Sequence, residues 1–197
     1  MTTTPRRLLV ALPAVMAGRR ASSQDITRRL VEAAREQTRH RVTYDGAYRL
    51  IGYPMGDVPA NIGVCTDLVV RAYRRLNLDL QALVHEDMAR HFALYPRHWG
   101  MTAPDTNIDH RRVPNLQVFF ARKGRALPFD NHDARRYAAG DMVTWRLPGN
   151  LPHIGIVSDR RTTFAARPLV IHNIGAGPVE DDILFAYPIT GRYRYPA

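Results

Sequence analysis

The chain has 197 residues, 28 Lys and Arg against 18 Asp and Glu, a formal net charge of +10, and a single cysteine. One cysteine can form neither an intramolecular disulfide nor a cysteine-rich zinc site, so disulfide-dependent scaffolds and zinc fingers are excluded. A hydrophobic content of 45% excludes a disordered chain. The length is typical of one domain.

The positive charge is carried almost entirely by arginine, because Lys123 is the single lysine of the chain. The arginines are scattered in short pairs such as Arg28-Arg29 and Arg160-Arg161. Nucleic-acid binders concentrate their charge in one patch or stripe. We therefore expect no nucleic-acid partner, whereas an anionic polymer remains compatible with this charge.

The N-terminus has the pattern of a secretory signal. Arg6 and Arg7 precede an apolar run from Leu8 to Ala17, which is too short to span a bilayer and ends in small residues. We predict a signal peptide at residues 1–17, a single domain at 18–197, and a periplasmic or secreted protein without stable membrane insertion. The alternative is an amphipathic or disordered start on a cytosolic protein.

The next part of the chain carries helical patterns. A cap at Ser22 and apolar positions at 3.6-residue spacing predict a helix over residues 24–38. Two further apolar stripes predict a helix that begins at Cys65 and another over residues 80–92. Pro114 then opens a short apolar helix.

The last third of the chain carries strand patterns, which are short β-branched or aromatic runs separated by Gly, Pro and Asn. These runs are residues 142–145, 153–157, 169–172 and 193–195. Helices followed by strands predict an α+β fold in which N-terminal helices pack on a C-terminal antiparallel β-sheet.

Cys65 is the candidate nucleophile. It begins a predicted helix, where unpaired N–H groups and the helix dipole favour a thiolate, so its pKa should lie below the ordinary value of about 8.5. Gly63 lets backbone amides approach a substrate oxyanion. His153 and His172 lie on predicted strands that could bring a base and its orienting partner together. The alternative is a small buried cysteine with two histidines that only pack.

Two metal-site patterns fail on spacing. His85-Glu86 begins like the H-E-x-x-H zinc motif, but Ala89 stands at its last position. Residues 105–109 resemble the start of an EF-hand loop, but His110 replaces the required glycine. The sequence therefore predicts no metal site, and an amide hydrolase based on Cys65 needs no cofactor.

Five motifs occur in a characteristic order along the chain. They are Gly52-Tyr53-Pro54-Met55-Gly56, residues 63–69, Gly140-Asp141-Met142-Val143, residues 153–157 and Ile171-His172-Asn173. This order resembles the signature of the NlpC-type papain-like cysteine peptidases. Shorter strings at residues 84–88, 107–115 and 172–175 resemble the bacterial family known as domain of unknown function 1287, over roughly residues 40–195.

The resemblance implies a papain-like (NlpC-type) cysteine hydrolase fold. It implies Cys65 as nucleophile, His153 as base, His172 as third member of the triad, and Tyr53 as a residue that lines the site. Relative to that superfamily, residues 77–139 form a long insert. The candidate substrate-binding residues are Tyr53, Asp57, Asp109, His110 and Arg111. For the last three, which lie in the insert, loop-closing salt bridges are the alternative role.

These observations predict a secreted cysteine hydrolase that cleaves an amide bond, in the peptide stems of peptidoglycan. The substrate would be a cell-wall peptide or another anionic polymer. Two alternatives remain open. One is a thiol acyltransferase or lipid-amide hydrolase on the same scaffold, and the other is a non-catalytic module that binds the cell wall or a polyanion.

Overall fold

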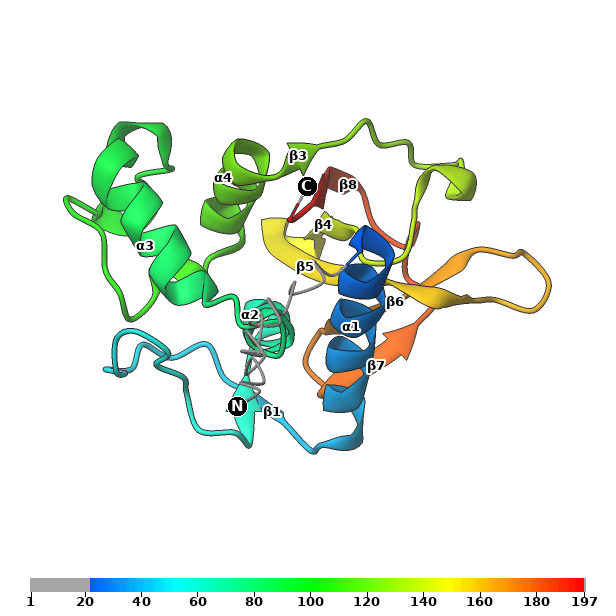
Figure 1. The fold of residues 1–197 in the computed structure, drawn as a ribbon, viewed down its shortest axis with the longest axis horizontal. Coiled ribbons are helices and arrows are strands. Elements are labelled where there is room, and N and C mark those ends of the chain that lie inside the picture. The colour runs from blue at the N-terminus through cyan, green and yellow to red at the C-terminus, as the bar shows by residue number, and fades with distance from the viewer. Residues whose placement is uncertain (1–21, 197) are drawn as a thin grey trace, which may run out of the picture.

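In the computed structural model, which describes residues 22–196, helices pack against one face of an antiparallel β-sheet (Figure 1). The predicted α+β fold is confirmed. The predicted signal peptide at residues 1–17 lies outside the described residues. Within them, no helix is both long enough and apolar enough to cross a membrane.

The main sheet has six strands in the order β3-β8-β4-β5-β6-β7, and all neighbours are antiparallel. Its strands are β3 (Arg125–Ala126), β4 (Met142–Leu147), β5 (Leu151–Arg161), β6 (Pro168–Asn173), β7 (Pro178–Asp181) and β8 (Ile189–Arg194). A separate parallel pair joins β1 (Thr43–Tyr44) to β2 (Ile62–Gly63). The four predicted strands correspond to β4, β5, β6 and β8, whereas the strands of two to four residues were not predicted.

Four α-helices complete the core. They are α1 (Ser23–Glu36), α2 (Cys65–Arg74), α3 (Leu80–His91) and α4 (Val113–Lys123). Short 3-10 turns connect them to the rest of the chain: η1 (Gln37–Arg39), η2 (Phe92–Leu94), η3 (His98–Gly100), η4 (Asp109–Arg111), η5 (Ala134–Arg136) and η6 (Pro148–Asn150). Figure 1 shows α1 and α2 in front of the sheet, with α3 and α4 beside α2 on the side away from β6 and β7.

Local signals explain where α1 begins and which side it buries. The Ser22 hydroxyl accepts the Asp25 N–H at 3.2 Å, a cap that typically contributes about 1 kcal/mol. The buried residues Leu30, Val31 and Ala34 lie on one stripe of the helix. The predicted helix over residues 24–38 is therefore confirmed within two residues at its end.

Strand alternation divides the interior into two apolar clusters. Ile154 and Ile156 of β5 pack in the cluster that contains α1 and α2. Trp145 and Val157 pack in a second cluster on the opposite face, beneath Leu184 and its neighbours. A side chain on β5 therefore faces either the helices or this second cluster, according to its parity.

The segment 77–139, expected as an insert, holds α3, η4 and α4, which pack beside α2 (Figure 1).

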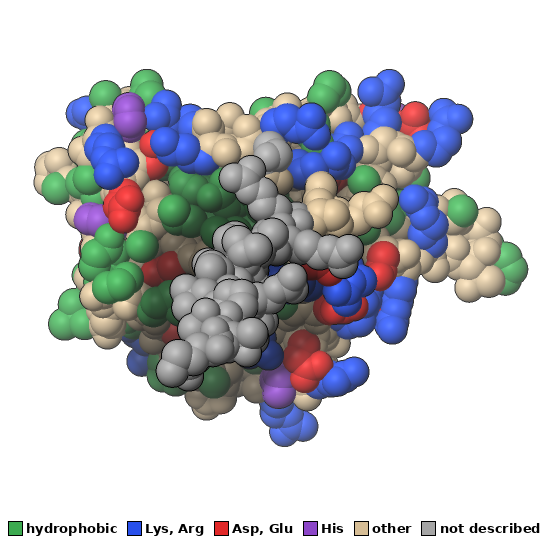
Figure 2. Space-filling view, in the orientation of Figure 1, with side chains coloured by type: hydrophobic (Ala, Val, Ile, Leu, Met, Phe, Trp, Pro, Cys, Tyr) green, Lys and Arg blue, Asp and Glu red, His purple; other side chains and the backbone are tan. Residues whose placement is uncertain are grey.

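The distribution of basic side chains on the surface agrees with the scattered positions of the arginines in the sequence. Figure 2 shows the basic side chains of this face between acidic and apolar ones, without one continuous basic patch on the part that the described residues form.

Candidate active site

An acidic side chain determines where α2 begins. Val64 is the N-cap residue, and its N–H donates to Asp67 Oδ2 at 2.7 Å. This bond satisfies a donor at the helix start that would otherwise lack a partner. Cys65 is therefore the first residue of α2, as the sequence predicted, but it is only 3% exposed.

A buried ion pair connects this helix start to two other segments. Arg111 of η4 donates from Nε to Asp67 Oδ1 at 2.8 Å and from Nη2 to Oδ2 at 3.0 Å. The same guanidinium donates to the carbonyl oxygens of Asp45 at 3.1 Å and Ala47 at 3.2 Å. Arg111 thus connects the beginning of α2, the loop after β1, and η4.

Three donor groups lie near the Cys65 thiol. They are the Ile154 N–H, the Tyr44 hydroxyl and the Thr66 N–H, and each lowers the thiol pKa. Burial outweighs them and, together with the negative charge of Asp67, raises the pKa of Cys65 to about 11. The expectation of a pKa below the ordinary value is wrong for the free protein, because the helix start lies in the core.

The thiol meets β5 where β5 and β6 separate. The register of these strands begins with Gly155 opposite His172, so Ile154 has no partner on β6 and its N–H is available to the sulfur. Ile154 directly follows His153. Strand parity places the His153 ring on the opposite face, with its centroid 5.7 Å from that of Trp145.

The structure brings the two predicted histidines together. His153 Nε2 and His172 Nδ1 lie 3.3 Å apart, and the two rings are nearly perpendicular. Gly155 makes this approach possible, because a Cβ there would lie 2.7 Å from Val170 Cγ1 and 3.1 Å from His172 Cβ. Both rings are buried.

Both histidines are neutral at neutral pH. Burial lowers the pKa of His153 to about 3, assisted by His172, and lowers the pKa of His172 to about 4. One of the two facing nitrogens must donate. If the Nε2–H of His153 donates, the Nδ1 of His153 keeps a lone pair that can accept a proton. His172 then carries its own hydrogen on Nε2. That nitrogen is buried and has no hydrogen-bond partner among the described residues.

A cavity of about 390 Å³ opens onto Cys65. Its lining includes Tyr44, Tyr48, Trp99, Arg111, Arg112, Pro114 and Pro152. No Asp or Glu between residues 22 and 196 lines it. The cavity is therefore apolar and aromatic with cationic groups at one wall, which suits an acyl group that carries negative charge nearby.

Tyr53 and Asp57, two of the predicted substrate-binding residues, do not line this cavity. The Tyr53 ring contacts His85 edge-on, with 5.2 Å between ring centroids. Asp57 pairs with Arg71 at 2.9 Å and Arg74 at 3.0 Å, so it attaches its loop to the far part of α2.

Asp109 and His110 are buried in the segment between α3 and α4 and do not line the cavity either. Asp109 pairs with Arg112 at 3.2 Å. Burial lowers the pKa of His110 to about 4, and its Nδ1 has no partner among the described residues. Of the five predicted substrate-binding residues, Arg111 is the one that borders the Cys65 cavity.

Two residues at the thiol escaped the sequence analysis. Asp67 follows the N-cap residue by three positions, the spacing of a capping box, and could have been recognised. Tyr44 lies in a strand of two residues and comes to Cys65 only through the pairing of β1 with β2. No local pattern marks it.

Comparison with known proteins identifies the family. The family model DUF1287, a domain of unknown function, matches residues 31–195. The chain belongs to this family. It is also 51% identical over 168 residues to the uncharacterized protein YijF of Escherichia coli (strain K12), covering 84% of this chain and 80% of the E. coli protein. The family expected from the sequence is confirmed.

Among solved structures, the chain is similar to NlpC1 from Trichomonas vaginalis, with a TM-score of 0.47 and 18% identity. The alignment covers 89% of this chain and 45% of that protein, so the chain spans less than half of its length.

Proposed function

We propose that the protein is a cysteine hydrolase that cleaves an amide bond, with Cys65 as nucleophile, His153 as base and His172 as the partner that orients the base. The observation that carries this proposal is the position of the thiol. The thiol begins a helix and lies near the N–H of Ile154, the residue that follows His153, and the His153 ring is paired with His172.

In the first step, neutral His153 takes the thiol proton as Cys65 attacks the substrate carbonyl carbon; because the resting ring packs on Trp145, it must first turn toward the thiol. The thiolate and imidazolium formed together attract each other, which offsets the cost of charging each buried group. The Cys65 N–H, the first of α2, has no intrahelical acceptor and can stabilise the developing oxyanion.

In the second step, the imidazolium of His153 gives its proton to the leaving amine as the C–N bond breaks. The acyl group then remains on Cys65 as a thioester. Water attacks the thioester, His153 again accepts a proton, and the thiol is restored as a carboxylic acid leaves. An amine or alcohol in place of water would give the transferase outcome from the same intermediate.

For the substrate we propose a peptide stem of the bacterial cell wall. Stem peptides carry carboxylates, and no carboxylate among the described residues lines the cavity beside Cys65, where Arg111 and Arg112 are paired with Asp67 and Asp109 behind the wall. The export pattern predicted at residues 1–17 would also deliver the protein to the wall.

The test is digestion of purified muropeptides, followed by mass spectrometry. The wild-type protein should produce fragments that have gained one water, whereas Cys65→Ala and His153→Ala should produce none while still unfolding in one cooperative transition. Fragments formed equally by Cys65→Ala would refute the assigned nucleophile. Adducts with added amines would indicate the transferase.

One observation favours a second candidate, a non-catalytic wall-binding module. The pKa of the thiol is raised by burial, as in a structural cysteine. In that case Cys65→Ala should bind muropeptides as well as the wild type does, and neither protein should release products. Because Cys65 is the single cysteine, alkylation measures its reactivity directly.

A further inference from the structure

A second cavity continues from the Cys65 cavity. It has a volume of about 730 Å³ and lies between η3 and α4 on one side and β4 and β8 on the other. Trp99, Pro114 and Pro152 line both cavities. A substrate that reaches Cys65 can therefore extend past these three residues into the second cavity.

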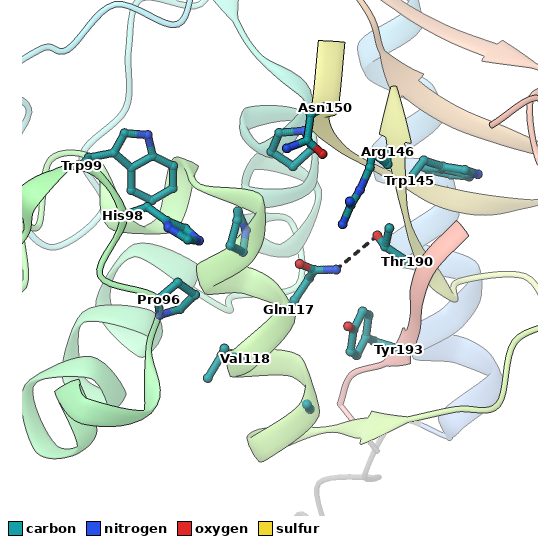
Figure 3. A pocket seen from close by; sticks show the side chains of 13 residues that line it. Pro96, His98, Trp99, Gln117, Val118, Trp145, Arg146, Asn150, Thr190 and Tyr193 are labelled. Carbon is teal, nitrogen blue, oxygen red and sulfur yellow. Dashed lines mark hydrogen bonds between the residues drawn. The ribbon is translucent and has the colours of Figure 1, made fainter. Parts of the chain in front are cut away.

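The second cavity contains a guanidinium that no carboxylate of residues 22–196 neutralises. Figure 3 shows Arg146 extending from β4 between Asn150 and Gln117. Among residues 22–196, no Asp or Glu lines the cavity and none forms an ion pair with Arg146. By contrast, the arginines of the neighbouring cavity are paired, Arg111 with Asp67 and Arg112 with Asp109.

The floor beneath Arg146 is held by internal hydrogen bonds. Gln117 Nε2 donates to Thr144 Oγ1 at 2.9 Å and to Thr190 Oγ1 at 3.4 Å, and Figure 3 shows the second of these bonds. The two threonine hydroxyls lie 3.0 Å apart. The side chains around Arg146 are thus already ordered, which reduces the entropy lost when a ligand binds.

The aromatic wall at the junction of the two cavities is also fixed. The Arg112 guanidinium lies 4.3 Å from the centroid of the Trp99 ring, and the His98 ring contacts Trp99 edge-on at 5.3 Å. Trp99 nevertheless remains 56% exposed. It offers apolar surface to a ligand between Cys65 and Arg146.

We propose that the second cavity is a substrate subsite for a carboxylate, held by the Arg146 guanidinium, with the chain of the substrate lying against Trp99. This inference rests on the proposed function for the identity of the substrate. Amides, hydroxyls and aromatic rings would also suit a neutral sugar. An unneutralised guanidinium in a cavity without lining acids favours the carboxylate, because the planar fork can donate two charge-assisted hydrogen bonds to it.

The chain offers a built-in probe of this cavity. It has two tryptophans, Trp99 and Trp145, and both line the second cavity. Binding to the Cys65→Ala protein, which cannot turn over, can be followed by tryptophan fluorescence. The titrants are a stem tripeptide with a free glutamate carboxylate and the same tripeptide with that carboxylate amidated.

We expect the acidic tripeptide to bind about tenfold more tightly than the amide, the effect of one charge-assisted contact. Arg146→Gln should abolish this preference. Arg90→Gln is the matched control, since its side chain is 68% exposed on α3 and outside both cavities. Arg146 is exposed, so the variant should keep the wild-type unfolding transition.

Three results would overturn the subsite. They are equal affinities for the acidic and amidated tripeptides, a preference that survives Arg146→Gln, and no fluorescence change at millimolar tripeptide. A neutral disaccharide that binds independently of Arg146 would instead assign the cavity to glycans. Failure of the hydrolase proposal would appear in product formation, which this binding measurement does not use.

Discussion

At the scale of single residues, burial and hydrogen bonding act on the Cys65 thiol in opposite directions. Burial raises its pKa, while the Tyr44 hydroxyl and two backbone N–H groups lower it. Burial also keeps His153 neutral, because it lowers the pKa of that ring to about 3. The free protein therefore holds a neutral thiol and a neutral candidate base, and under the proposed mechanism charge would develop only during reaction.

Removing the Tyr44 donor should make the thiol less acidic. We expect Tyr44→Phe to raise the pKa of Cys65 and to slow its alkylation about tenfold at a fixed pH near 8, since one hydrogen bond to a charged group contributes about 1.5–3 kcal/mol. The measurement is the pH dependence of the alkylation rate. Tyr48→Phe is the control, because Tyr48 lines the same cavity but its hydroxyl donates to Asp105 at 3.0 Å. Equal rates in both variants would contradict the Tyr44 contact.

The lowered pKa of His153 should move the loss of activity at acidic pH to lower pH values. His153 must be neutral to accept the thiol proton, and a pKa of about 3 keeps it neutral as the pH falls from 7 to 5. We expect kcat/KM on a muropeptide to show no loss centred near pH 6.5, the ordinary histidine value. An acid limb at that pH would show that the reacting histidine is solvated.

At the scale of elements, the pair between Asp67 and Arg111 holds α2, η4 and the loop after β1 together. Both side chains are at most 3% exposed, so neither charge can be solvated if its partner is removed. The free-energy cost of removing these two charges from water is offset only while they remain paired. Correct placement of Cys65, the proposed nucleophile, and of Tyr44 therefore depends on a residue of the segment 77–139.

Breaking this pair should be strongly destabilising. We expect Arg111→Met to lower the free energy of unfolding by about 3–5 kcal/mol, measured by denaturant titration, because it leaves the Asp67 carboxylate buried and unpaired. Adding Asp67→Asn should recover part of the loss. Arg49→Met is the control, since Arg49 is 42% exposed in its pair with Asp45 and should cost at most about 1 kcal/mol. Similar losses in both single variants would argue against the role of burial.

At the scale of the whole molecule, three buried histidines couple folding to pH. Burial is the first cause that lowers the pKa values of His110, His153 and His172, to about 4, 3 and 4. In the unfolded chain these groups titrate near pH 6.5. As the pH falls below 6.5, the unfolded chain binds protons that the folded protein does not, so stability is lost in that window.

We expect the free energy of unfolding to fall by about 2 kcal/mol per buried histidine between pH 6.5 and pH 5, at about 1.4 kcal/mol per pH unit. Denaturant titrations across this range would measure it. His110→Leu removes one of the three groups and should reduce the slope of the free energy of unfolding against pH by about one third. His40→Leu, at an exposed position, is the control and should leave this slope unchanged. A flat profile in the wild type would mean that these rings are solvated.

Features set by short stretches of chain were open to prediction from the sequence. Ser22 caps α1 through a bond three residues away, and α2 begins at Cys65 because the N-cap and Asp67 lie within one turn. Short β-branched runs bounded by Gly, Pro and Asn placed β5 and β6, and with them His153 and His172. Each of these features depends on neighbours along the chain.

Features set by packing were decided only by the tertiary structure. The pKa of Cys65 rises because the core surrounds it, a condition that helix position alone does not reveal. Tyr44 meets the thiol through a strand pair of two residues, and Arg111 is held by Asp67, 44 positions away in sequence. Burial and long-range pairing depend on which segments meet in space, so local sequence patterns contain no signal for them.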